Sequence, residues 1–167
     1  MRRTLPLAIV VFTALLLQTT AFNEVTLAGA KPELMYLVTI LAALLEGPAT
    51  GAVVGFAGGM SQDFLLNQPK GITALVLTLL GNFVGQARTY IVTPSPWLPV
   101  LLVGLGTFGG VIFYSIVSFI LGQLDVSWFY AFRMAVLSGI YNALLTPVVY
   151  PIMRRVCEDR SMTLFRR

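Results

Sequence analysis

The side chains that carry most enzyme chemistry are scarce in this sequence of 167 residues. It contains no histidine and a single cysteine, Cys157. These two counts exclude Ser-His-Asp triads, histidine metal sites, imidazole proton relays and an intrachain disulfide. The aspartates Asp63, Asp125 and Asp159 are too scattered to form the acidic cluster that a magnesium-dependent lipid transferase needs. No G-x-S-x-G, P-loop or dinucleotide-binding motif occurs. The sequence therefore predicts a protein that is not an enzyme and that holds no metal or cofactor.

Ionisable residues inside apolar stretches are the remaining candidates for chemistry. Such residues are costly at membrane depth and are usually paired. We expect Asp63 to lie at the level of Arg133, and Glu46 at the level of Arg88, so that two ion pairs can form. A structural clamp is the favoured role for each pair, and a substrate site is the alternative. Asn142, deep in the last apolar stretch, needs a partner on another helix or on unwound backbone.

Other polar residues of the apolar stretches are expected to have structural roles. Gln18, Asn82 and Gln86 are candidates for hydrogen bonds between helices. Pro32 and Glu33 favour a helix start, because proline tolerates the first turn and a carboxylate is stabilised at the positive end of a helix.

The elements that position these residues are predicted to be transmembrane helices. The chain is 57% apolar and 11% charged, with a mean hydropathy of +0.84, whereas a soluble domain has about 25% charged residues. Such a chain can neither cover a water-facing surface nor be disordered. Six spans of about 20 residues each leave no room for a separate soluble domain. The net charge of +4 is attributed to basic residues on the cytoplasmic side and not to nucleic-acid binding.

The charge-free runs predict an all-α integral membrane protein with one domain, residues 1–167, folded as a six-helix transmembrane bundle with short loops. The first run is interpreted as an uncleaved helix, and a secretory signal is the alternative. Residues 89–124 would span about 54 Å as one helix, which is too long for a core of about 30 Å. The predicted helices cover residues 5–22, 32–45, 48–65, 72–91, 98–121 and 128–152, followed by a cytoplasmic tail over 153–167.

Six spans place both termini on one side of the membrane. Eight of the 11 basic residues fall on that side, while Lys31, Lys70 and Arg133 fall at or near the other. An excess of Lys and Arg marks the cytoplasmic side, so both termini are predicted to be cytoplasmic. Pro147 and Pro151 each remove a backbone donor and predict a kink near the inner end of the last helix.

Glycines at a spacing of four form one smooth stripe on a predicted helix. The stripe consists of Gly47, Gly51, Gly55 and Gly59, and Gly81-x-x-x-Gly85 is a shorter version on the next helix. Small residues let helices approach closely in lipid. Two interpretations stay open: the stripe packs within this protein's own bundle, or it is the surface that binds a partner's membrane helix.

The order of the motifs resembles that of a known family. Residues 31–88 contain Pro32-Glu33-Leu34, an apolar helix, Glu46-Gly47-Pro48, then Gly51-x-x-x-Gly55-Phe56-x-x-Gly59 and Asp63. Near the other end, residues 141–147 are followed by Pro151 and Arg154-Arg155. Together these motifs resemble the rod shape-determining protein MreD family, and the similarity extends over nearly the whole length.

The resemblance implies a non-enzymatic component of the bacterial cell-wall elongation machinery in the plasma (inner) membrane. MreD proteins associate with MreC, so the single membrane helix of MreC is the expected partner. That assembly links MreB filaments inside to RodA and its partner transpeptidase, which build peptidoglycan outside. The family's fold also looks like that of the substrate-binding subunits of energy-coupling-factor vitamin transporters. A vitamin-binding subunit is therefore the alternative, and it needs a closed outer cavity, for which the sequence offers Gln62, Asp63, Asn67 and Arg133.

Overall fold

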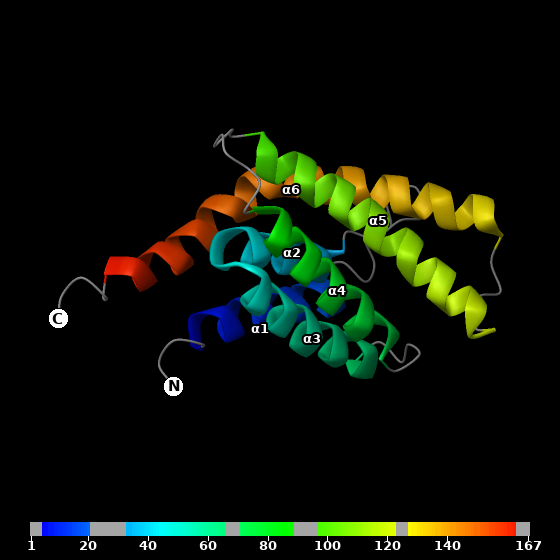
Figure 1. Cartoon of the computed structure of the whole chain (residues 1–167), viewed down its shortest axis with the longest axis horizontal. Helices are drawn as coiled ribbons and strands as arrows, with labels where there is room; N and C mark the ends of the chain where they lie inside the picture. The colour runs from blue at the N-terminus through cyan, green and yellow to red at the C-terminus, as the bar shows by residue number, and fades with distance from the viewer. Residues whose placement is uncertain (1–4, 21–32, 66–70, 89–96, 123–126, 163–167) are drawn as a thin grey trace.

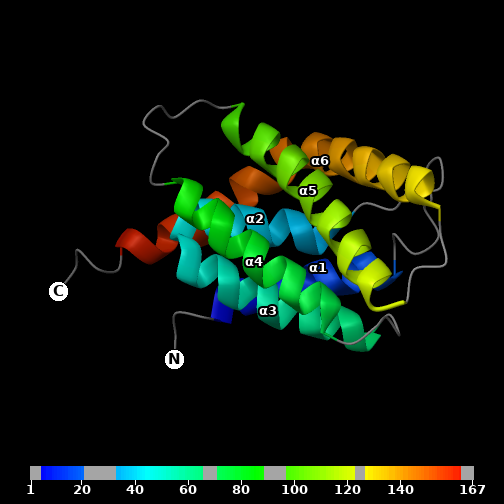
Figure 2. The same cartoon turned by 45° about the vertical axis from the view of Figure 1, so that its right-hand side comes forward.

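The protein is built of helices, and one of them is surrounded by the others. A computed structural model describes residues 5–20, 33–65, 71–88, 97–122 and 127–162. Figures 1 and 2 show α5 and α6 side by side along one side of the molecule, α1 and α3 on the opposite side, and α2 between them. The described ranges contain the α-helices α1 Leu5–Thr20, α2 Leu34–Glu46, α3 Pro48–Leu65, α4 Ile72–Ala87, α5 Leu98–Ile120 and α6 Trp128–Met162.

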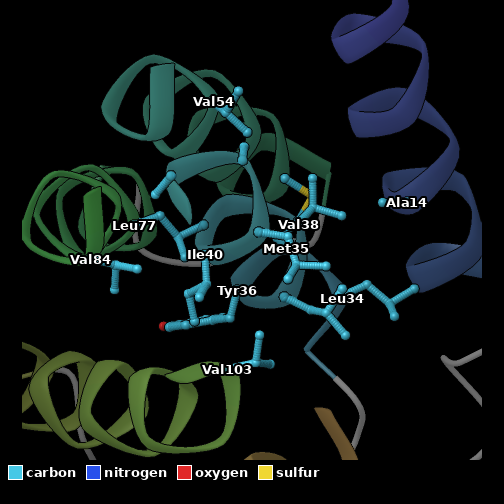
Figure 3. Packing of buried hydrophobic residues seen from close by; sticks show 14 of the residues in the cluster. Ala14, Leu34, Met35, Tyr36, Val38, Ile40, Val54, Leu77, Val84 and Val103 are labelled. Atoms are coloured by element: carbon cyan, nitrogen blue, oxygen red, sulfur yellow. The ribbon is translucent and has the colours of Figure 1, made fainter. Parts of the chain in front are cut away.

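Helix α2 forms the centre of the bundle because almost all of its residues are apolar, so every face can pack. All residues from Leu34 to Ala43 are buried, and α2 contacts each of the other five helices. Figure 3 shows Leu34 on the side of α1 and Tyr36 on the side of α5. With 13 residues, α2 is about 20 Å long. The remaining helices are therefore positioned by their contacts with this short central helix.

Helices α3 and α4 approach until their backbones are in contact. A Cβ atom added to Gly55 would lie 2.3 Å from the carbonyl oxygen of Leu77, and one added to Gly81 would lie 2.4 Å from that of Gly51. At Gly59 the same addition would come within 2.6 Å of the α4 backbone. These separations leave no space for any side chain, so the pair can pack in this way only with glycine at these positions.

The predicted glycine stripe is therefore internal, and the prediction that a partner helix packs on it is wrong. Gly51, Gly55 and Gly59 are buried against α4 and the neighbouring helices. Gly47 has a different role, because it is the single residue between α2 and α3 and has a φ of 102°. That backbone conformation favours glycine. Of the two interpretations, packing within the bundle is the one that holds.

Helix α6 is longer than predicted. It continues to Met162, so most of the predicted tail at 153–167 is helical, and the predicted end at residue 152 is wrong. No glycine or proline lies between Pro151 and Met162 to end the helix. Pro147 and Pro151 lie inside α6, which changes direction in its second half in Figures 1 and 2, as a proline kink requires. The predicted ends of the first and fourth helices, at residues 22 and 91, fall outside the described residues.

The outer faces of the helices are apolar, whereas several polar side chains are buried. Phe129 and Phe83 are 79% and 67% exposed, while Asp63 and Asn142 are fully buried. Such large exposed apolar surfaces are rare in water-soluble monomers. Two helical segments, Leu98–Ile120 and Trp128–Cys157, are long and apolar enough to cross a membrane, and three shorter apolar segments are Leu7–Gln18, Leu34–Glu46 and Ile72–Ala87. These properties are those of a helical membrane protein.

Gly55→Ala is expected to destabilise the protein by about 1–3 kcal/mol, because the new Cβ atom overlaps the α4 backbone and the two helices must separate. Gly109→Ala is the matched control, since no atom lies within 4 Å of its added Cβ. Alanine favours a helix over glycine by up to about 1 kcal/mol, so this control should keep or raise the melting temperature. Thermal unfolding of the purified variants measures both effects, and equal melting temperatures would contradict the close packing of α3 on α4.

Candidate functional site

A group of polar side chains converges where α1 ends, α2 begins and α3 ends. We call Gln18, Glu33, Gln62 and Asn142 the Glu33 cluster. Oε2 of Glu33 accepts hydrogen bonds from Nε2 of Gln18 at 3.1 Å and from Nε2 of Gln62 at 3.3 Å. One carboxylate oxygen therefore joins α1 and α3 to the start of α2.

The cluster also satisfies backbone groups at the start of α2. The first turn of a helix has N–H groups without intrahelical partners, and these need acceptors when water is excluded. The carbonyl oxygen of Glu33 accepts the backbone N–H groups of Tyr36 and Leu37. Oε1 of Gln18 accepts the N–H of Met35 at 3.2 Å. A side chain from α1 thus completes the N-terminus of the central helix.

Asn142 connects the α5–α6 pair to the same cluster. It is fully buried, and its Nδ2 donates to the carbonyl oxygen of Glu33 at 2.8 Å and to Oγ1 of Thr107 at 3.0 Å. The side-chain amide therefore links α6 to α5 and to the start of α2. This contact confirms the prediction that Asn142 bonds to another helix.

Asp63 binds the start of α4, and the predicted ion pair with Arg133 is not formed. Oδ2 of Asp63 accepts the backbone N–H groups of Gly71 at 2.8 Å and Ala74 at 3.3 Å, which satisfies donors of the first turn. Its Oδ1 is buried with no hydrogen-bond partner in the described part of the chain. Arg133 is exposed on α6. Similar depth in the bundle was therefore not enough to bring this pair together.

At the other end of the bundle, Arg88 lies beside the turn between α2 and α3. Its Nη1 is 4.0 Å from the position of a Cβ atom added to Gly47, the residue that follows Glu46. This proximity is what the predicted Glu46–Arg88 pair requires, and the pair itself stays a prediction.

Beside the Glu33 cluster is a polar cavity of about 180 Å³. Its wall includes Glu33 and Gln62 together with three tyrosines, Tyr36, Tyr114 and Tyr130. Oε1 of Gln62 is buried with no hydrogen-bond partner among the described residues. Within those residues, no three cysteine, aspartate or glutamate side chains are grouped as metal ligands would be. The wall has the composition of a site for a small polar group.

Two apolar grooves lie on the outer faces. The α1–α3 groove, of about 500 Å³, is lined by Val11, Phe12, Ala49, Val53 and Ala57 among others. The α5–α6 groove, of about 460 Å³, lies between the first half of α5 and the middle of α6. Both grooves can accept apolar side chains or acyl chains.

Sequence reasoning identified part of this site. Gln18 is buried in the cluster as expected. Gln86 is exposed and bonds Asn82 on its own helix, and the expected contact of these two residues with another helix stays a prediction. Glu33 begins α2 as predicted, and Pro32 lies outside the described residues. The cavity tyrosines were missed, although Tyr36 follows Glu33 by three residues, the spacing of neighbours on a helix.

The fold and the site define an all-helical membrane protein whose polar residues are held inside the bundle. The family model for the rod shape-determining protein MreD matches residues 1–156. The chain belongs to the MreD family, as the resemblance predicted. No curated protein and no solved structure matches it. The MreD family is a family of shape-determining structural proteins, and membership in it implies a role in rod shape determination.

Asn142→Ala is expected to lower stability by about 1–3 kcal/mol, because it removes two hydrogen bonds inside the bundle, one to the carbonyl oxygen of Glu33 and one to Oγ1 of Thr107. Asn82→Ala, the same change at a half-buried position on α4, should have a smaller effect. Thermal unfolding in detergent measures both. In a double-mutant cycle, Thr107→Val should couple to Asn142→Ala by about 0.5 kcal/mol or more, and additive effects would show that the hydrogen bond between them does not stabilise the bundle.

Proposed function

We propose that the protein is a non-enzymatic membrane scaffold of the bacterial cell-wall elongation complex, with six spans in the plasma membrane and both termini in the cytoplasm. The family match over residues 1–156 carries this proposal. The apolar outer faces support it. The beginning of α1 and the end of α6 also lie toward the same end of the molecule in Figures 1 and 2, as an even number of crossings requires.

The proposed partner is the membrane helix of MreC, and the α1–α3 groove is the surface that fits it best. Along α3 the groove is lined by Ala49, Val53, Ala57 and Ser61, which repeat every fourth residue and therefore form one stripe. Three of these four side chains are small, and small residues permit close approach of a second helix in lipid. Through MreC, the protein connects MreB inside to RodA and its partner transpeptidase, which make peptidoglycan outside.

The alternative of a vitamin-binding subunit of an energy-coupling-factor transporter is less favoured. Pockets for small molecules of that size usually measure about 300–1,000 Å³, and the polar cavity measures about 180 Å³. Arg133, one of the polar candidates for such a pocket, is exposed, and Asn67 lies outside the described residues.

Depletion of the protein in a rod-shaped host is expected to make the cells round, because the elongation complex loses a structural member. Phase-contrast microscopy measures the width and length of the cells, and re-expression of the wild-type chain should restore rods. An unchanged shape together with a requirement for an added vitamin would reject the scaffold function and support the transporter subunit.

Ala57→Leu is expected to reduce co-purification of MreC by about tenfold or more, because a bulky side chain in the α1–α3 groove opposes close helix contact at a cost of about 1–3 kcal/mol. Gly109→Leu is the control, since this exposed residue on α5 lies outside the groove. Both variants should insert and melt like the wild type. Undiminished capture of MreC by the Ala57 variant would exclude this groove as the binding surface.

A further inference from the structure

The polar cavity of about 180 Å³ beside the Glu33 cluster has the size and the wall of a site for a small neutral ligand. We infer that it binds the hydroxyl groups of a glycerol-like polyol, either as the headgroup of phosphatidylglycerol or as a free molecule. At about 30 Å³ per water molecule, the cavity corresponds to about six water-sized groups, which is about the size of glycerol. Such binding does not depend on the proposed scaffold function.

Gln62 supplies a buried acceptor that needs a donor. The residue is 3% exposed and forms part of the cavity wall. Its Nε2 atom donates to Oε2 of Glu33 at 3.3 Å, whereas its Oε1 atom is buried with no hydrogen-bond partner among the described residues. A buried acceptor without a donor is unfavourable. An O–H group in the cavity removes that penalty.

Hydroxyl side chains add further hydrogen-bonding capacity to the wall. Oγ of Ser115 donates to the carbonyl oxygen of Val111 at 2.9 Å, so its lone pairs can still accept a hydrogen bond. Tyr114, the preceding residue, also lines the cavity, and a phenol can both donate and accept. A ligand hydroxyl has the same dual capacity, so it can donate to Gln62 and accept from a phenol.

The wall favours a neutral ligand over an anion. No lysine or arginine is among the described residues that line the cavity, so an anion finds no basic side chain there. The amide of Gln62 is neutral, so its Oε1 atom requires a hydrogen-bond donor and not a positive charge. A hydroxyl group likewise needs hydrogen bonds but no counter-charge when it leaves water. Only the terminal glycerol of phosphatidylglycerol would therefore enter, with its phosphate outside.

Aromatic rings form the apolar part of the wall and its entrance. Tyr36 is buried and lies against Gly110, where an added Cβ atom would come within 2.5 Å of its Cε1. Tyr130 is 43% exposed, so it lies at the open side of the cavity near the start of α6. Sites for small molecules usually combine aromatic surface with a few polar groups. The carbon chain of a polyol can pack on the rings while its hydroxyls bond the polar groups.

The test measures glycerol binding to the full chain in nanodiscs of phosphatidylcholine, a lipid whose headgroup has no O–H group. Saturation-transfer NMR gives the affinity, with empty nanodiscs as the background. Glycerol is expected to bind. Dimethoxyethane, which has as many non-hydrogen atoms but no O–H group, should bind about tenfold more weakly because it cannot donate to Oε1 of Gln62. Equal affinity for the two probes, or no binding of glycerol, would overturn the inference and leave water as the occupant.

A second arm distinguishes the two sources of the hydroxyl groups. Part of the phosphatidylcholine is replaced by phosphatidylglycerol or, as a control for charge, by phosphatidic acid. If the headgroup is the natural ligand, phosphatidylglycerol should compete with glycerol and weaken its apparent affinity, whereas phosphatidic acid should not. Unchanged affinity in both lipids identifies a soluble polyol as the ligand.

Variants connect the binding to the cavity. Gln62→Leu should weaken glycerol binding about tenfold because the acceptor is lost, whereas Gln86→Leu, the same change at an exposed position on α4, should leave it unchanged. Ala131→Leu enlarges a side chain of the cavity wall and should also weaken binding about tenfold, because less space remains for the ligand. Its control is Ala143→Leu, the same change on α6 in the wall of the α5–α6 groove.

The Ala131 pair keeps the test decisive if Gln62→Leu does not fold. Undiminished binding by the folded Ala131 variant, or an equal loss in its Ala143 control, would place the polyol elsewhere and overturn the inference.

Discussion

The burial of the start of α2 is the constraint on which the rest of the structure depends. A helix that is surrounded on every side cannot leave the N–H groups of its first turn to water. The backbone carbonyl oxygen of Glu33 and the side-chain oxygen of Gln18 accept hydrogen bonds from N–H groups there. The side-chain amide of Asn142, on α6, donates to the same carbonyl oxygen of Glu33. Four helices therefore meet at one set of hydrogen bonds, with Gln62 of α3 on the carboxylate. The polar residues of this apolar chain gather at this point because a buried helix end requires them.

Close packing of α3 on α4 follows from a second physical requirement. In lipid, helices gain little from burying apolar side chains, so close van der Waals packing and hydrogen bonds between helices hold them together. Gly55 and Gly81 permit that contact, and Asp63 fixes the register by accepting N–H groups at the start of α4. The same helix presents Val53 to the outside. One face of α3 therefore packs on α4, and the face that carries Val53 remains available for a partner.

Much of the fold, and less of the site, follows from sequence patterns. Charge-free runs and Gly47-Pro48 locate the helices, because charges and turn residues mark where apolar segments stop. A glycine stripe has the same sequence pattern whether it packs against a helix of the same bundle or against the helix of another protein. Only the structure could therefore show which of the two it contacts. Depth along a helix gives no direction around the axis, which is why Arg133 was wrongly paired with Asp63. The need of Asn142 for a partner was predictable, but its backbone acceptor at Glu33 has no signature in the sequence.

The Glu33 cluster also links the interior of the bundle to its outer surface. Gln18 belongs to α1 and Gln62 to α3, and both donate to the same carboxylate oxygen. These two helices are also the walls of the α1–α3 groove. Two hydrogen bonds to one atom therefore connect the two walls at this end. A groove whose walls are connected in this way can position another helix, as the proposed scaffold function requires.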